Sequence, residues 1–132
     1  MTLIDTNVLL DLFTNDPVWA AWSIGQLDAA AARGALLIND VVYAELSVRF
    51  NTIEALDAVL QEAQIVLDPM PRGALFLAGK VFQQYRAAGG LRTGVLPDFF
   101  IGAHAAVVGR PLLTRDVQRY RTYFPTLVLI TT

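Results

Sequence analysis

The sequence predicts an α/β protein, a three-layer α/β/α sandwich with a mainly parallel sheet of about five short strands. Short apolar segments of strand length alternate along the chain with longer segments in which apolar residues recur at helical spacing. The short segments are apolar on both faces, which is typical of strands buried between two layers of helices. A chain of 132 residues has the length of one compact domain, so we expect residues 1–132 to form a single domain.

Five segments are predicted to be strands because each is short, apolar and bounded by polar residues, glycine or proline. They are residues 2–4, 35–38, 64–67, 111–113 and 127–130. Helical segments separate them, and strands joined by helical crossovers pair in parallel. The carboxyl ends of such strands meet at one edge of the sheet, where open α/β folds bind their ligands.

Helical segments are predicted from apolar spacing and from the residues at their ends. They are residues 7–13, 17–33, 41–50, 52–63, 71–88, 99–108 and a last short helix between Thr114 and Tyr123. Asp16 with Pro17, Asp40 and Thr114 stand where they can cap helix starts. Glycine follows the helices that end at residues 33, 88 and 108, as expected at a helix stop.

Composition excludes several classes of protein. The longest nearly apolar segment, residues 99–109, is interrupted by His104 and is shorter than the roughly 20 residues of a membrane span. The chain has no cysteine, which excludes a disulfide framework and a zinc–thiolate site. Its start lacks the basic and long apolar regions of a signal peptide, so we expect a cytoplasmic protein. Charged residues are only 17% of the chain, which favours apolar surface covered in an oligomer.

The charges are divided unevenly along the chain. Residues 1–68 hold ten acidic and two basic residues, whereas residues 69–132 hold eight basic residues and two acidic ones, Asp98 and Asp116. The net charge of −2 conceals this division. A basic half fits contact with a polyanion. On charge alone, a solvated helical surface facing an acidic one is the slightly better explanation.

Acidic residues stand where predicted strands end and helices begin: Asp5, Glu45, Asp98 and Asp116. Asp5 follows the first strand and Asp116 follows the fourth, so both should lie at the carboxyl edge of the sheet. Asp98 lies on the buried stripe of its helix. Glu45 shares a helix face with apolar neighbours, and a buried carboxylate requires a partner. Arg49, four residues later, is one possible partner, and a divalent cation is the other.

Four carboxylates, no cysteine and a single histidine indicate Mg²⁺ or Mn²⁺ rather than zinc. Such an ion activates a water and stabilises the charge that develops on a phosphate. Each acid alone has a simpler explanation: Asp5, Asp98 and Asp116 could cap helices, and Glu45 could pair with Arg49. Those explanations leave the convergence of the four acids unexplained.

Other conspicuous residues are interpreted structurally. His104 lies in an apolar helix and is expected to be a core or interface histidine rather than a metal ligand. Trp19 and Trp22, three residues apart, are expected to make core or dimer contacts rather than stack on bases. Residues 89–94 are interpreted as a plain connection, with a substrate loop as the alternative.

Four motifs together resemble a PIN domain of the VapC toxin type. They are residues 4–9 (IDTNVL), residues 44–45 (AE), residues 98–105 (DFFIGAHA) and residues 113–116 (LTRD) followed by Tyr120. The resemblance covers the whole chain with the motifs in order, and glycine at position 102 is its one mild departure, since alanine is commoner there. It implies an endoribonuclease that uses one or two Mg²⁺ or Mn²⁺ ions.

By this resemblance Asp5, Glu45, Asp98 and Asp116 are the catalytic and metal-binding acids. Hydrogen bonds from neighbouring side chains would support them, and these supporting residues are Thr6, Asn7 and Thr114. The resemblance also implies an RNA substrate, a homodimer or higher complex, and a small VapB-like antitoxin. Two further residues, Arg92 and Arg115, are expected to hold flanking phosphates because of their charge and their position in the sequence.

Three alternatives remain. The chain could be a PIN-type nuclease of RNA processing with no toxin role, or a PIN-like subunit that has lost catalysis. It could also be a receiver-like signalling domain with a Mg²⁺ pocket. A receiver domain should carry paired acids after the first strand and a lysine after the last one, but position 6 is threonine and the only lysine is Lys80.

Overall fold

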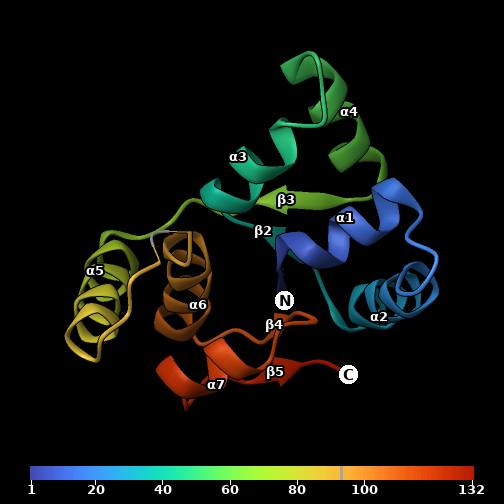
Figure 1. The fold of residues 1–132 in the computed structure, drawn as a ribbon. Helices are drawn as coiled ribbons and strands as arrows, with labels where there is room; N and C mark the ends of the chain where they lie inside the picture. The colour runs from blue at the N-terminus through green and yellow to red at the C-terminus, as the bar shows by residue number, and fades with distance from the viewer. Residues whose placement is uncertain (93) are drawn as a thin grey trace.

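The computed structural model describes residues 1–92 and 94–132, and it contains a five-stranded, all-parallel sheet. The strands are β1 (Thr2–Ile4), β2 (Leu36–Ile38), β3 (Ile65–Leu67), β4 (Leu112–Leu113) and β5 (Leu129–Ile130). Helices flank the sheet (Figure 1). The predicted α/β class and parallel pairing are confirmed, and each predicted strand is present, although most are shorter than expected.

The strand order β3-β2-β1-β4-β5 places the first strand of the chain at the centre of the sheet. β1 pairs with β2 on one side and with β4 on the other. A receiver domain has the order 2-1-3-4-5, so the observed order argues against that alternative. The central position of β1 also puts Asp5, the residue after this strand, in the middle of the carboxyl edge.

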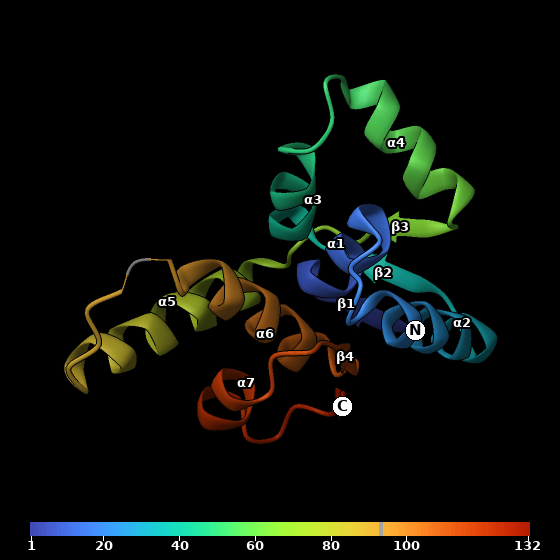
Figure 2. The same cartoon turned by 45° about the vertical axis from the view of Figure 1, so that its right-hand side comes forward.

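The helices that the structure describes lie close to the predicted segments. They are α1 (Thr6–Thr14), α2 (Ala20–Arg33), α3 (Asp40–Ser47), α4 (Ile53–Glu62), α5 (Arg72–Ala87), α6 (Leu96–Val108) and α7 (Gln118–Tyr123). Figures 1 and 2 place α3 and α4 beside β3, α5 next to α6, and α7 at the opposite end of the molecule beside β5. In the described part of the chain, none of the helices has the length and apolar character to cross a membrane.

Three helix starts differ from the prediction by about three residues or more: those of α2, α6, which begins at Leu96 rather than at residue 99, and α7. The Oδ1 atom of Asp16 accepts hydrogen bonds from the backbone N–H groups of Val18 and Trp19, both at 2.9 Å. A capping turn therefore fills residues 17–19, and α2 begins only at Ala20. α7 begins at Gln118 rather than just after Thr114, whose hydroxyl oxygen accepts from the backbone N–H of Asp116 at 3.0 Å.

The predicted cap of α3 is wrong by one residue. Asn39, not Asp40, caps this helix, and its side-chain oxygen accepts from the Val42 N–H at 2.9 Å. Asp40 instead accepts from the backbone N–H of Met70 at 3.0 Å. The carboxylate of Asp40 therefore ties the start of α3 to the segment that follows β3.

The core lies on both faces of the sheet, as the apolar strands predict. Leu3, Ile4, Ile38, Leu112 and Leu113 have no exposed surface. Apolar side chains of this size, fully buried, each stabilise a fold by about 1.5–3 kcal/mol relative to exposure. The rigid centre of the sheet thus supports the residues at its carboxyl edge.

Candidate active site

Asp5 is held in a buried position directly after the central strand. Its backbone N–H donates to the carbonyl oxygen of Leu113 at 2.9 Å, which extends the pairing of β1 with β4. Its side chain belongs to a residue that is only 3% exposed. Its Oδ2 atom accepts from the Thr114 hydroxyl at 2.8 Å, from the Tyr120 hydroxyl at 2.9 Å and from Asn7 Nδ2 at 3.4 Å. All three donors bind Oδ2, and none of them binds Oδ1.

Thr114 and Asn7 connect the end of β4 to the start of α1. The Thr114 oxygen accepts from the backbone N–H of Asp116 at 3.0 Å and from Asn7 Nδ2 at 3.4 Å. The Asn7 side-chain oxygen accepts from the backbone N–H of Arg115 at 3.3 Å. The turn that carries Asp116 is therefore fastened to the same groups that hold Asp5, and the structure brings the predicted supporting residues Asn7 and Thr114 to the site.

Asp98 lies in the first turn of α6 and forms an ion pair with Arg119 of α7. Its side chain is 26% exposed, so it lies at the wall of the site rather than in the core. Arg119 also reaches Asp116, with 3.9 Å between Nη1 and Oδ2. One guanidinium thus stands between two of the predicted acids.

Glu45 is half-buried on α3, not core-facing as the sequence predicted. Its Oε1 atom accepts from the Thr6 hydroxyl at 2.7 Å. Among the described residues it forms no ion pair with Arg49, so that predicted alternative is wrong. Because Glu45 accepts a hydrogen bond and remains partly in contact with solvent, its carboxylate avoids the free-energy cost of burial without a partner. Thr6 thereby links Glu45 to the residue that follows Asp5.

The acids influence one another electrostatically. Burial raises the pKa of Asp5 from 3.8 to about 6, and the negative charge of Asp98 contributes, although hydrogen bonds from Thr114 and Tyr120 oppose the rise. Burial also raises the pKa of Asp98; Arg119 counters this effect, while the charges of Asp116 and Glu45 add to it. Without a bound cation, Asp5 and Asp98 therefore lose their protons less readily than ordinary aspartates.

These carboxylates suit a hard divalent cation, although they are not closed around one. No group of three acidic or histidine side chains within residues 1–92 and 94–132 lies close enough to hold a metal ion as it stands. The donors are nevertheless all carboxylate oxygens, which suit Mg²⁺ and Mn²⁺. The Arg119 cation already lies between Asp98 and Asp116, which shows that positive charge is accommodated there.

Arg115 is occupied by a structural contact. Its Nε and Nη2 atoms donate to the carboxylate of Asp11 at 2.6 and 2.8 Å, and its guanidinium lies 4.9 Å from the Trp19 ring centroid. Asp11 is 3% exposed and also accepts from Ser23 at 2.8 Å. Arg115 thus joins α1, α2 and the β4 turn, so its contact with substrate remains only a prediction. Trp19 packs edge-on against Trp22, as a structural role requires.

Arg92 is exposed in the connection between α5 and α6, and its backbone N–H donates to the Tyr85 hydroxyl at 3.2 Å. Position 93, within the segment 89–94 interpreted as a plain connection, is outside the described residues. The predicted phosphate contact of Arg92 therefore stays a prediction.

His104 lies outside the acid cluster. It is fully buried on α6, and its Nε2 atom lies 3.1 Å from Oδ2 of Asp68, which also accepts from Arg110 at 3.1 Å. Burial lowers the pKa of His104, although the Asp68 charge opposes this. A neutral core histidine agrees with the interpretation from sequence. Its Nδ1 atom has no partner among the described residues.

Two site residues, Tyr120 and Arg119, were not predicted as such. Tyr120 is fully buried, and burial together with the Asp5 charge raises its pKa well above 10, so its hydroxyl keeps its proton and donates. Both residues follow Asp116 at helical spacing, three and four positions later, and this spacing was the available signal. α7 therefore touches Asp5 and Asp98 through neighbouring side chains.

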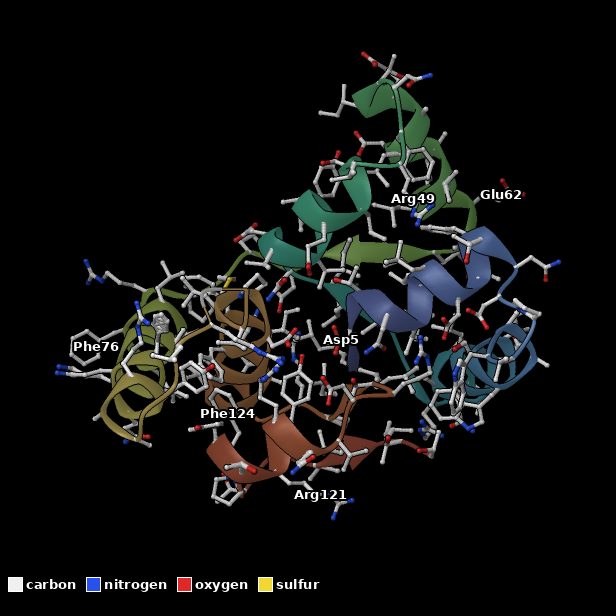
Figure 3. All side chains as sticks on the ribbon, viewed as in Figure 1. Asp5, Arg49, Glu62, Phe76, Arg121 and Phe124 are labelled. Carbon is white, nitrogen blue, oxygen red and sulfur yellow. The ribbon has the colours of Figure 1, made fainter. Side chains whose placement is uncertain are left out.

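Gly102 allows α7 to approach α6 this closely. A Cβ atom at Gly102 would lie 2.5 Å from Cε2 of Phe124 and 3.1 Å from Cδ1 of Tyr120. Figure 3 shows Phe124 where α7 meets α6, and Asp5 near the centre of the molecule. Glycine at position 102, a departure from the commoner alanine, thus has a packing reason.

The structure is thus an all-parallel α/β fold with a buried carboxylate, Asp5, at the carboxyl edge of its central strand. The sequence model of the PIN domain family matches residues 2–125. The chain therefore belongs to the PIN domain family, whose members are nucleases that generally use divalent metal ions. No match was found among curated protein sequences.

Solved structures support the same fold. VapBC2 from Rickettsia felis, bound to a DNA fragment from its promoter, has a chain 18% identical to this one with a TM-score of 0.75, covering 99% of this chain and 98% of that chain. VapBC-1 from nontypeable Haemophilus influenzae is 18% identical with a TM-score of 0.71, covering 98% of this chain and 96% of that chain. FitAcB from Neisseria gonorrhoeae is 16% identical with a TM-score of 0.68, covering 98% of this chain and 96% of that chain. At these identities the likeness shows the fold.

Proposed function

We propose that the protein is a Mg²⁺- or Mn²⁺-dependent endoribonuclease and the toxin of a toxin–antitoxin pair. The observation that carries the proposal is the environment of Asp5. Its carboxylate is buried at the centre of the carboxyl edge, and Thr114 and Tyr120 hold one oxygen. Burying a charge in this way is costly without a cation, and Asp98 adds repulsion.

Asp5 and Asp98 would hold the one or two ions, with Asp116 and Glu45 completing the set. When bound, such an ion supplies an activated water and positive charge for the phosphate that is attacked. The chain's own part is to orient Asp5: the Thr114 and Tyr120 hydroxyls hold its Oδ2 atom and oppose the rise in its pKa that burial causes. Glu45, which is partly exposed and accepts a hydrogen bond from Thr6, would complete the ligand set or orient the water.

The proposed partners follow from the family and the structural neighbours. VapBC and FitAcB complexes, and a toxin–antitoxin complex from Klebsiella pneumoniae, share the fold. We propose a small VapB-like antitoxin as the partner of this chain, RNA as its substrate and a homodimer as its basic assembly. We further propose that the protein acts in the cytoplasm. We propose that residues 1–132 fold as a single domain.

Cleavage of RNA by the purified chain tests the nuclease proposal. Wild type should cut RNA with Mg²⁺ or Mn²⁺ and lose this activity in EDTA. Asp5→Asn and Asp98→Asn should each reduce cleavage at least about 100-fold, because a group that supports developing charge is lost. Asp28→Asn, which removes an exposed carboxylate of α2, is the matched control and should cut like wild type. Circular dichroism verifies folding, and undiminished cleavage by both site variants would refute the assignment.

Expression in bacteria separates the toxin from a processing nuclease. Induction of this chain alone should arrest growth, and co-expression of a small protein encoded beside its gene should restore growth. Mapping of RNA ends after induction identifies the substrate. Efficient cleavage in vitro without growth arrest, and without a neighbouring small protein that binds the chain, would favour RNA processing instead.

A further inference from the structure

Arg119 places a permanent positive charge inside the acidic site. Its side chain pairs with Asp98 and lies 3.9 Å from Asp116. Arg119 and Asp98 are each 26% exposed, so the pair is partly shielded from water. Pairs of this kind, in which arginine donates to a carboxylate, are among the stronger hydrogen-bonded contacts in proteins.

The position of Arg119 is set by rigid neighbours. The next residue, Tyr120, is fully buried and donates to Asp5, which anchors α7 beside the site. α7 also packs against Gly102 of α6, the helix that carries Asp98. The backbone of Arg119 is therefore fixed beside the site, and its partly exposed side chain has several rotatable bonds.

Arg121 provides a contrast on the same helix. It is exposed, and Figure 3 shows it pointing away from the molecule. Among the described residues it forms no ion pair, whereas Arg119, two positions earlier, reaches two acids. The contact is therefore a property of one position on α7 and not of the basic charge of the helix.

The guanidinium and a divalent ion compete for the same two carboxylates. Arg119 pairs with Oδ2 of Asp98 and lies 3.9 Å from Oδ2 of Asp116, and its positive charge repels a divalent cation that approaches either carboxylate. We propose that Arg119 is the resident cation of the metal-free site, a positioning residue that holds Asp98 and is displaced when a divalent ion binds. This inference rests on the proposed metal-dependent function and adds that Arg119 sets the metal concentration at which the site fills.

Metal binding to the isolated chain tests the inference without any RNA. Calorimetric titration with Mn²⁺ should give Arg119→Gln a Kd about three- to tenfold lower than that of wild type. In wild type, the molecules in which Arg119 occupies the carboxylates cannot bind the ion, and this lowers the apparent affinity. Arg121→Gln removes the same charge from the same helix and should change Kd by less than about twofold, as expected for a distant, screened charge. Arg119→Lys, which keeps the charge but not the planar fork, should lie between wild type and Arg119→Gln.

Nuclear magnetic resonance follows the displacement in wild type, so the test does not depend on a folded variant. The Arg119 Nε–H signal should shift as Mg²⁺ is added, with a midpoint at the Kd. The Arg115 signal should stay in place, since its partner Asp11 lies outside the acid cluster. Metal binding with an unmoved Arg119 signal, or an Arg119→Gln variant that binds no better than Arg121→Gln, would overturn this inference alone. Failure of every variant to bind metal would overturn the proposed function as well.

Discussion

The raised pKa of Asp5 predicts that its replacement stabilises the metal-free protein. In the unfolded chain Asp5 loses its proton near pH 4, whereas in the folded protein its pKa is about 6. Between these values the folded state binds more protons than the unfolded state, so stability falls as pH rises through this range. The rise from 3.8 to about 6 corresponds to a penalty of about 3 kcal/mol above pH 6.

Asp5→Asn should remove this penalty. Asparagine is neutral at every pH, and its side-chain oxygen can still accept from Thr114 and Tyr120. We expect the free energy of unfolding of the variant to exceed that of wild type by about 2–3 kcal/mol at pH 8, and by almost nothing at pH 4. Urea denaturation in EDTA at pH 4, 5, 6, 7 and 8 measures the difference.

Two comparisons sharpen the test. Asp28→Asn, on the exposed face of α2, should show no growing difference across the same pH range. Addition of Mg²⁺ at pH 8 should stabilise wild type and leave Asp5→Asn unchanged, because a ligand stabilises only the state that binds it. If Asp5→Asn were less stable than wild type at pH 8, or if the difference were the same at every pH, burial of an unfavourable charge would be refuted.

Three further substitutions test contacts around the site. Tyr120→Phe deletes a hydroxyl that donates to Asp5 at 2.9 Å and should lower stability at pH 8 by about 1–3 kcal/mol in urea denaturation. Gly102→Ala places a Cβ atom 2.5 Å from the Phe124 ring and should cost about 1–3 kcal/mol, seen as a lower melting temperature; an unchanged melt would mean that the ring moves freely. Arg115→Ala leaves its buried carboxylate partner without a cation and should cost up to about 3 kcal/mol in urea denaturation; an unchanged free energy of unfolding would contradict a stabilising ion pair.

The sheet and the place of Asp5 were predictable because they depend on local patterns. Parallel strands covered on both faces must be apolar, so short apolar segments between helices indicate them directly. A carboxylate immediately after such a strand then has only the carboxyl edge to occupy. The same reasoning placed Thr114 and Asp116 after β4, and the structure brings Thr114 to 2.8 Å from Asp5.

Contacts between distant residues were not predictable in this way. Asp11 and Arg115 are 104 positions apart, and nothing in the sequence around either residue indicates the other. Arg115 was therefore assigned to substrate from its charge and its position in the sequence. Glu45 was expected to face the core because helical spacing gives the direction of a side chain but not what covers it. Val42 and Leu46 on α3 are buried, yet Glu45 is half-buried and contacts Thr6.

The order of strands in the sheet also governs when the site can form during synthesis. β1 and β2 leave the ribosome early, but β1 can complete its pairing only after β4, and Asp5 gains its Tyr120 contact across 115 positions of sequence. Contacts of such long sequence separation form late and slowly. An emerging chain carries Asp5 long before it carries the residues that orient it. The hydrogen bonds that orient Asp5 are therefore complete only after Tyr120 has been synthesised.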